Sequence, residues 1–118
     1  MSTKRAERVS ILLKEVASNI VHRTIQFPDA VLVTVTRVTT SPDLHYSHIM
    51  VTVYPANDEI KEKVIALLRK NTPEIQYQLN RKLRMRPVPK ITFNFDDAED
   101  RRERVEKILG KTREEESL

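Results

Sequence analysis

The sequence predicts an α+β fold, in which one three-stranded sheet carries helices on one face and forms a single two-layer domain. Apolar residues recur at helical spacing in residues 5–25, and two runs rich in β-branched residues follow between residues 31 and 54. A short alternating run occupies residues 90–95. A length of 118 residues allows one core of modest size. The predicted order is therefore α-β-β-α-α-β, followed by a short terminal helix.

The first helix, over residues 5–25, is predicted to be amphipathic. Phe27 and Pro28 end it, because the residue before a proline is pushed out of the helical region. The residues at helical spacing that form its buried stripe are Val9, Leu12, Leu13, Val16, Ile20 and Val21.

Residues 31–40 and 44–54 are predicted to be two strands of a hairpin. The segment Ser41–Pro42–Asp43 supplies the turn between them, since proline suits an early turn position. The residues predicted to face inward are Val31, Val33 and Val35 in the first strand and Ile49, Val51 and Val53 in the second.

A kinked pair of helices is predicted next. Asn57 or Asp58 caps the first of them, and the Thr72–Pro73 pair interrupts the pattern. Proline is favoured at the first position of a helix, so Pro73 is predicted to start the second. The apolar stripes consist of Ile60, Val64, Leu67 and Leu68 in the first helix and Ile75, Leu79 and Leu83 in the second.

The last predicted strand covers residues 90–95, with Ile91, Phe93 and Phe95 pointing inward. An acidic turn over residues 96–100 leads to a short helix that ends near Gly110. The prediction is therefore one domain over residues 1–110 and a disordered charged tail over residues 111–118.

Composition excludes several classes of function. The chain holds no cysteine, so disulfides, thiolate zinc sites and iron–sulfur ligation are excluded. A single glycine cannot build a P-loop or a dinucleotide-binding loop, because these need several positions of positive φ or close backbone approach. We therefore expect no cofactor and no nucleotide-dependent enzyme.

Targeting signals are also not expected. No apolar run follows Lys4 and Arg5 as it would in a signal peptide, and no stretch approaches the ~18 apolar residues of a membrane span. The sequence therefore predicts a soluble protein of the cytoplasm.

Positive charge is concentrated between Lys70 and Lys90. This window holds six cationic side chains and one acid, a net charge of +5, whereas the whole chain carries +4. A compact cationic patch on a small domain attracts polyanions, and phosphate backbones are the commonest of these in a cell. The alternative is a solvated helix face, since the helix dipole also favours cations near a C-terminus.

The other reactive side chains give weaker indications. His45 and His48 are three apart on a strand and point to opposite faces, so no metal site is predicted. Aromatic rings are the usual platforms for unpaired bases, and Tyr77 is the first tyrosine to consider for this role. The acids of residues 96–100 have no apolar pocket to raise a pKa, so they are interpreted as helix caps and no catalytic residue is predicted.

The predicted order of elements is that of the type II KH topology, and local motifs resemble the ribosome-binding factor A family. Residues 38–44 (VTTSPDL), followed by the strand end at 51–54 (VTVY), resemble the family's hairpin. Residues 83–93 (LRMRPVPKITF) resemble its Leu-Arg-rich helix end and Pro-led strand, which an acidic turn follows. Residues 5–9 (RAERV) resemble the start of its first helix. The resemblance covers roughly residues 5–100.

The resemblance implies a non-catalytic ribosome assembly factor, bacterial or organellar, that binds the immature small (30S-type) ribosomal subunit. Such a factor assists late processing and maturation of the small-subunit rRNA, leaves before translation and is tied to growth in the cold. The implied partners are the small subunit and its rRNA, with no membrane and no small-molecule substrate, and the implied state is a monomer. Where the family has an Ala-x-Gly kink between its middle helices, this chain has Asn71-Thr72-Pro73.

The predicted interface combines the basic window with the start of the first helix, where cations oppose the helix dipole. The predicted RNA-binding residues are Lys70, Asn71, Thr72, Arg81, Lys82, Arg84, Arg86, Lys90, Arg5 and Arg8. The rival hypothesis is a protein–protein adaptor whose basic patch binds an acidic partner. Salt-dependent binding to rRNA separates the two hypotheses.

Overall fold

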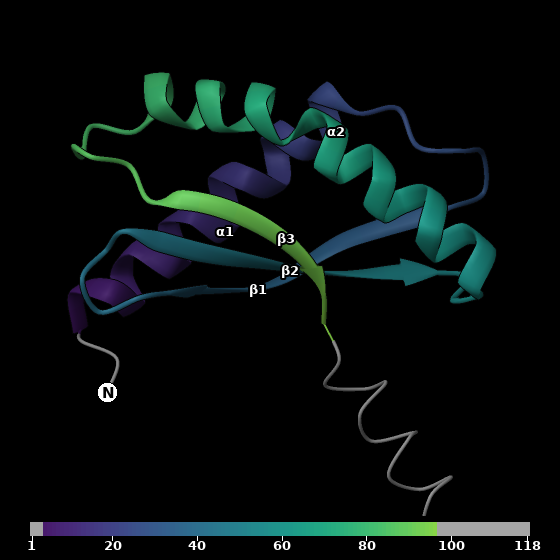
Figure 1. Cartoon of the computed structure of the whole chain (residues 1–118), viewed down its shortest axis with the longest axis horizontal. Coiled ribbons are helices and arrows are strands. Elements are labelled where there is room, and N and C mark those ends of the chain that lie inside the picture. Colours follow the sequence, from purple (N-terminus) through teal and green to yellow (C-terminus); the bar gives the residue numbers. More distant parts are fainter. Residues whose placement is uncertain (1–3, 97–118) are drawn as a thin grey trace, which may run out of the picture.

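The computed structural model describes residues 4–96 (Figure 1). The elements are α1 (Lys4–Thr24), β1 (Leu32–Thr40), β2 (Tyr46–Tyr54), α2 (Asp58–Lys82) and β3 (Lys90–Phe95). Buried residues of both helices join those at alternate positions of the three strands in one core. The predicted α+β fold with one three-stranded sheet is confirmed, and the predicted bounds of α1 and the strands agree within two residues.

The sheet is mixed. Its strand order is β1-β2-β3, with β1 antiparallel to β2 and β3 parallel to β2. A bulge between Val35 and Arg37 shifts the register of β1. An extra residue in one strand reverses the face of every later side chain, so Val38 and Thr40 are buried after the bulge. The sequence indicated the hairpin but not this reversal.

The buried face of α1 differs from the predicted one at Leu12. This side chain is 44% exposed, whereas Leu13 and Ile20 are fully buried. Ala6 and Ala17 occupy the buried stripe instead. The buried stripe of α1 therefore includes two small alanine side chains and excludes Leu12.

The prediction of two middle helices is wrong, because α2 runs without interruption for 25 residues with Pro73 inside it. A proline inside a helix removes one backbone hydrogen bond and costs about 3 kcal/mol. Leu68 and Ile75, on either side of Pro73, are both fully buried, and burial of such side chains offsets that cost. The ribbon of α2 changes direction partway along its length, so the predicted kink is present within a single helix (Figure 1).

The predicted cap of α2 is confirmed at Asn57, whose side-chain oxygen accepts the Ile60 N–H at 2.9 Å. Of the acids predicted to cap a helix after β3, Asp96 lies within the described residues, and the helix itself lies outside them. The Asp96 carboxylate accepts the Thr36 hydroxyl at 2.6 Å and lies 3.6 Å from Arg37, so it joins the end of β3 to the bulge of β1.

The remaining predictions for the C-terminal part concern residues outside the described range. These are the acidic turn beyond Asp96, the short helix ending near Gly110, the tail over residues 111–118 and the domain limit at residue 110.

Candidate nucleic-acid interface

The C-terminal half of α2 and the start of β3 are tied together by one side chain. Gln76 donates from Nε2 to the Pro89 carbonyl at 3.1 Å, and its Oε1 accepts the Ile91 N–H at 2.9 Å. The Lys90 N–H points the other way and donates to His45 of the β hairpin at 2.8 Å. Gln76 therefore bonds the outer edge of β3 and holds this edge against α2.

Two adjoining hollows lie between α2 and the segment that leads into β3. One has a volume of about 420 Å³ and the other about 500 Å³, and Asn80 and Val88 line both. The first is also lined by Thr72, Pro73, Gln76, Lys90 and Ile91. The second is also lined by Tyr77, Arg81, Arg86 and Pro87. We call the two hollows together the α2–β3 groove.

The groove is cationic and partly preorganised. Arg81 donates to the Tyr77 hydroxyl at 3.3 Å, and its guanidinium carbon lies 5.7 Å from the Tyr77 ring centroid. Nη1 of Arg86 donates to the carbonyls of Leu83 and Met85, both at 2.8 Å. Among the residues that line the two hollows there are three cations and no acid. The groove can therefore attract an anion, and its arginines need little reordering to receive one.

The structure divides the predicted site residues of α2 and the segment after it into two groups. Arg81, Arg86, Lys90 and Thr72 line the groove. The other four lie outside its lining.

Those four residues differ in their surroundings. Lys82 and Arg84 are exposed, and Lys82 follows Gln78 by one turn on the flank where Gln78 donates to Thr24 of α1. Lys70 is exposed as well, whereas Asn71 turns back and donates to the Leu67 carbonyl at 2.8 Å.

Arg5 and Arg8 are exposed in the first turns of α1. Along the long axis of the molecule, the start of α1 lies at the same end as the loop between α2 and β3 (the left end in Figure 1). The start of α1 therefore shares one end of the domain with the loop between α2 and β3, although Arg5 and Arg8 do not line the groove.

Sequence reasoning missed the polar and apolar lining of the groove. Gln76 and Asn80 were not predicted as site residues, and neither were Pro87 and Val88. The spacing of Pro73, Gln76 and Asn80 places them on one helical face, which was an available signal. That this face borders β3 depends on a contact between two elements, which helical spacing does not specify.

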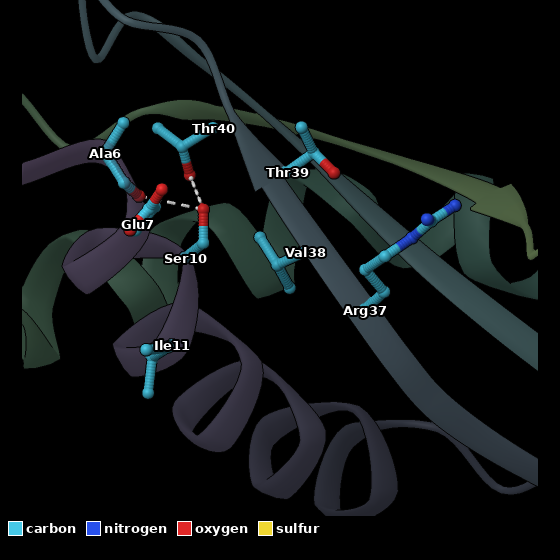
Figure 2. A pocket seen from close by; sticks show the side chains of 8 residues that line it. All are labelled: Ala6, Glu7, Ser10, Ile11, Arg37, Val38, Thr39 and Thr40. Atoms are coloured by element: carbon cyan, nitrogen blue, oxygen red, sulfur yellow. Dashed lines mark hydrogen bonds between the residues drawn. The ribbon is translucent and has the colours of Figure 1, made fainter. Parts of the chain in front are cut away.

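A third hollow, of about 400 Å³, lies between α1 and β1 (Figure 2). We call it the α1–β1 hollow. Ile11 and Val38 contribute to its largely apolar lining. Ser10 donates to the hydroxyl of Thr40 at 2.8 Å, and Thr40 in turn bonds the buried Ser47 hydroxyl at 2.8 Å. The hydroxyls are thus bonded to one another.

Within residues 4–96, no group of three histidine, aspartate or glutamate side chains is placed to hold a metal ion. Neither of the two described helices is long and apolar enough to cross a membrane.

Comparison with known proteins gives consistent matches. A family profile described as "Ribosome-binding factor A" matches residues 5–109. Ribosome-binding factor A of Protochlamydia amoebophila is 36% identical over 119 aligned positions, which cover 99% of this chain and 90% of that protein.

Solved structures resemble this one in fold. The crystal structure of ribosome-binding factor A from Thermus thermophilus superposes with a TM-score of 0.65, at 20% identity over 76% of this chain and 94% of that one. A homology model of Thermus thermophilus ribosome binding factor A, as fitted into the cryo-EM map of a 30S-RBFA complex, superposes with a TM-score of 0.65, at 22% identity over 79% of this chain and 96% of that one.

Proposed function

This chain belongs to the ribosome-binding factor A family, and we propose that it binds the small ribosomal subunit and assists late maturation of its rRNA without catalysing a reaction. The observation that carries the proposal is the family match across residues 5–109. The Thermus thermophilus factor has been fitted into the map of a 30S-RBFA complex, which supports the choice of subunit. The cationic α2–β3 groove supplies a surface suited to the rRNA.

The proposed mechanism is electrostatic docking followed by recognition of shape. Arg81, Arg86 and Lys90 at the groove attract phosphates, and Arg5 and Arg8 extend the positive field at the same end of the domain. Phosphate contacts set affinity but carry little information about sequence. Specificity is then expected from the fit of the kinked α2 and the groove to a folded rRNA junction.

The kink in α2 has a direct part in this proposal. Thr72 and Pro73 line the groove next to Lys90. The Thr72 hydroxyl donates to the Leu68 carbonyl at 2.8 Å, within α2. Asn71-Thr72-Pro73 thus replaces the small residues of the family kink with a bulkier wall, and RNA is expected to contact the cations beside it.

Sedimentation tests the proposal. Tagged protein should migrate with free small subunits and not with assembled ribosomes, since an assembly factor leaves before translation. As monomer is the expected state, the unbound protein should sediment as a single 13.8 kDa chain. Equal occupancy of free subunits and assembled ribosomes at matched concentrations would contradict the role in assembly.

The same experiment addresses the adaptor hypothesis. Subunits stripped of protein, or naked small-subunit rRNA, should still bind the factor at low salt and release it as salt rises. Binding that needs a ribosomal protein and does not respond to salt would instead support an adaptor for a protein partner.

A further inference from the structure

The larger hollow of the α2–β3 groove combines an exposed aromatic ring with two arginines. Tyr77 is 54% exposed although it has a large apolar ring. Arg81 lies near its hydroxyl edge, with a hydrogen bond of 3.3 Å and a distance of 5.7 Å from guanidinium carbon to ring centroid. A base placed on the accessible part of this ring would have a stacking surface and a cation next to it.

Arg86 also lines this hollow and is held by the main chain. Its Nη1 donates to the carbonyl of Leu83, the C-terminal cap of α2, and to that of Met85 in the segment after the helix. The bonds use only one guanidinium nitrogen, so the others are left to face a phosphate. A fixed guanidinium loses less side-chain entropy on binding than a free surface arginine does.

Polar and apolar groups complete the hollow. Asn80 lies where the two hollows meet, and its Oδ1 accepts Gln76 Nε2 at 3.1 Å. Its Nδ2 bonds no partner within the described part of the chain and is therefore a donor to the edge of a ligand. Pro87 and Val88 add apolar surface to the lining.

We propose that this hollow, lined by Tyr77, Asn80, Arg81, Arg86, Pro87 and Val88, holds one unpaired nucleotide of the rRNA. The base stacks on Tyr77 against Pro87 and Val88, Asn80 donates to the base edge, and Arg81 and Arg86 bind the flanking phosphates. The volume of about 500 Å³ lies within the usual range of ligand sites. This inference rests on the proposed function and adds to it the kind of RNA feature that the groove recognises.

A paired base does not fit this description, because both of its faces are covered within the duplex. An acidic protein side chain would use the arginines but would leave the ring of Tyr77 without a stacking partner. The exposed ring therefore favours an unpaired nucleotide over an acidic peptide.

Three RNA hairpins test the proposal with the full chain. One carries a single bulged adenosine, the second has an abasic residue in the bulge, and the third is fully paired. The first two have the same phosphates, so any preference reports the base. The wild-type protein should bind the adenosine bulge about five- to a hundredfold more tightly than the abasic bulge, which is the range expected for one stacked base. Equal binding of the first two hairpins, or no binding to any of them at low salt, would overturn the proposal.

Variants at Tyr77 separate stacking from folding and charge. Tyr77→Phe keeps the ring and should keep the preference, whereas Tyr77→Leu should reduce it to less than twofold. Both variants should melt like the wild type, because Tyr77 is exposed. A preference that survives Tyr77→Leu would place the base elsewhere.

Two competitors identify the source of the ligand. Adenosine monophosphate should displace the bulged hairpin only at a concentration at least a hundredfold above that of the unlabelled hairpin. Polyglutamate should compete no better than other polyanions. Equal potency of the free nucleotide, or stronger competition by polyglutamate than by RNA, would overturn the proposal.

Sedimentation keeps the two proposals distinguishable. Co-migration of the wild type with small subunits, together with equal binding to the adenosine and abasic hairpins, would retain the proposed function and reject the nucleotide site. Loss of subunit binding by the wild type itself would reject the proposed function.

Discussion

Two open hollows of similar size differ in what their walls offer a ligand. The α1–β1 hollow measures about 400 Å³ and the larger hollow of the α2–β3 groove about 500 Å³. In the first, the hydroxyls of Ser10 and Thr40 are bonded to each other, and Thr40 also bonds the buried Ser47 behind it. In the second, Tyr77 presents an exposed ring and Arg86 is fixed with part of its guanidinium open. Volume is thus a poor guide to a binding site. The α1–β1 hollow is lined by one cation, Arg37, which lies 3.6 Å from Asp96, whereas the groove is lined by three cations and no acid and has an accessible ring.

The largest expected effect concerns the support beneath the groove. Leu79 is fully buried in the core under α2, so Leu79→Ala should lower the free energy of unfolding by about 2–5 kcal/mol through loss of packing and a residual cavity. Ile11 on the rim of the α1–β1 hollow is 71% exposed, and Ile11→Ala should change this free energy by no more than about 0.5 kcal/mol. Urea denaturation of both variants measures the difference. Similar losses of unfolding free energy in the two variants would mean that the core packing beneath the groove contributes no more to stability than the rim of the α1–β1 hollow.

The next largest expected effect is a difference in subunit binding between two pairs of cations in the basic window. Arg81 and Arg86 line the groove, whereas Lys82 and Arg84 carry the same charge at the same helix end outside it. Replacing the first pair with alanine should weaken subunit binding at least tenfold, or about 1.4 kcal/mol. Replacing the second pair should weaken it less than threefold, because it removes only long-range attraction.

Salt dependence provides an independent measure of the same pairs. If the wild type neutralises about four phosphates, the logarithm of the binding constant should fall against that of salt with a slope of about −3 to −4. Replacing the groove pair should make this slope shallower by about 1.4 to 1.8, since two contacts are lost. Equal changes from both pairs would assign binding to general charge and not to the groove.

The smallest expected effect concerns the turn between β1 and β2. The Ser41 hydroxyl and then the His45 N–H donate to Asp43, and these bonds hold the pKa of this carboxyl below its ordinary value of 3.8. A lowered pKa in the folded state stabilises the fold above pH 3.8, and this contribution is lost as pH falls through the folded-state value. Asp43→Asn should therefore reduce the pH dependence of the melting temperature in this acidic range. It should leave subunit binding unchanged, because Asp43 does not line the groove.

Local pattern predicted the elements of this fold well. Alternation and the flanking prolines gave β3 its bounds at Lys90–Phe95, since both signals are contained within a few residues. The low helix preference of proline predicted a break at Pro73, and this was wrong because packing on both sides of the residue keeps α2 continuous. The bulge at Val35 and Arg37 was missed because a single extra residue in a strand leaves little trace in a run of valines and threonines.

The candidate site could be predicted only in part for the same reason. Charge counting found the segment that holds Arg81, Lys82 and Arg86, but it could not tell which of these cations border the groove. That distinction depends on where β3 lies against α2. Gln76, whose amide joins the two elements, carries no charge and so gave no signal in a charge count.

The position of Gln76 also affects how this protein avoids associating with itself. β3 is an edge strand of the sheet, and open strand edges are templates on which other chains can add a strand and aggregate. By bonding the Pro89 carbonyl and the Ile91 N–H, the Gln76 amide occupies the first part of that edge. One neutral side chain therefore both sets the width of the groove and protects the edge, so a defect at this position would appear in a cell as poor solubility as well as weak binding.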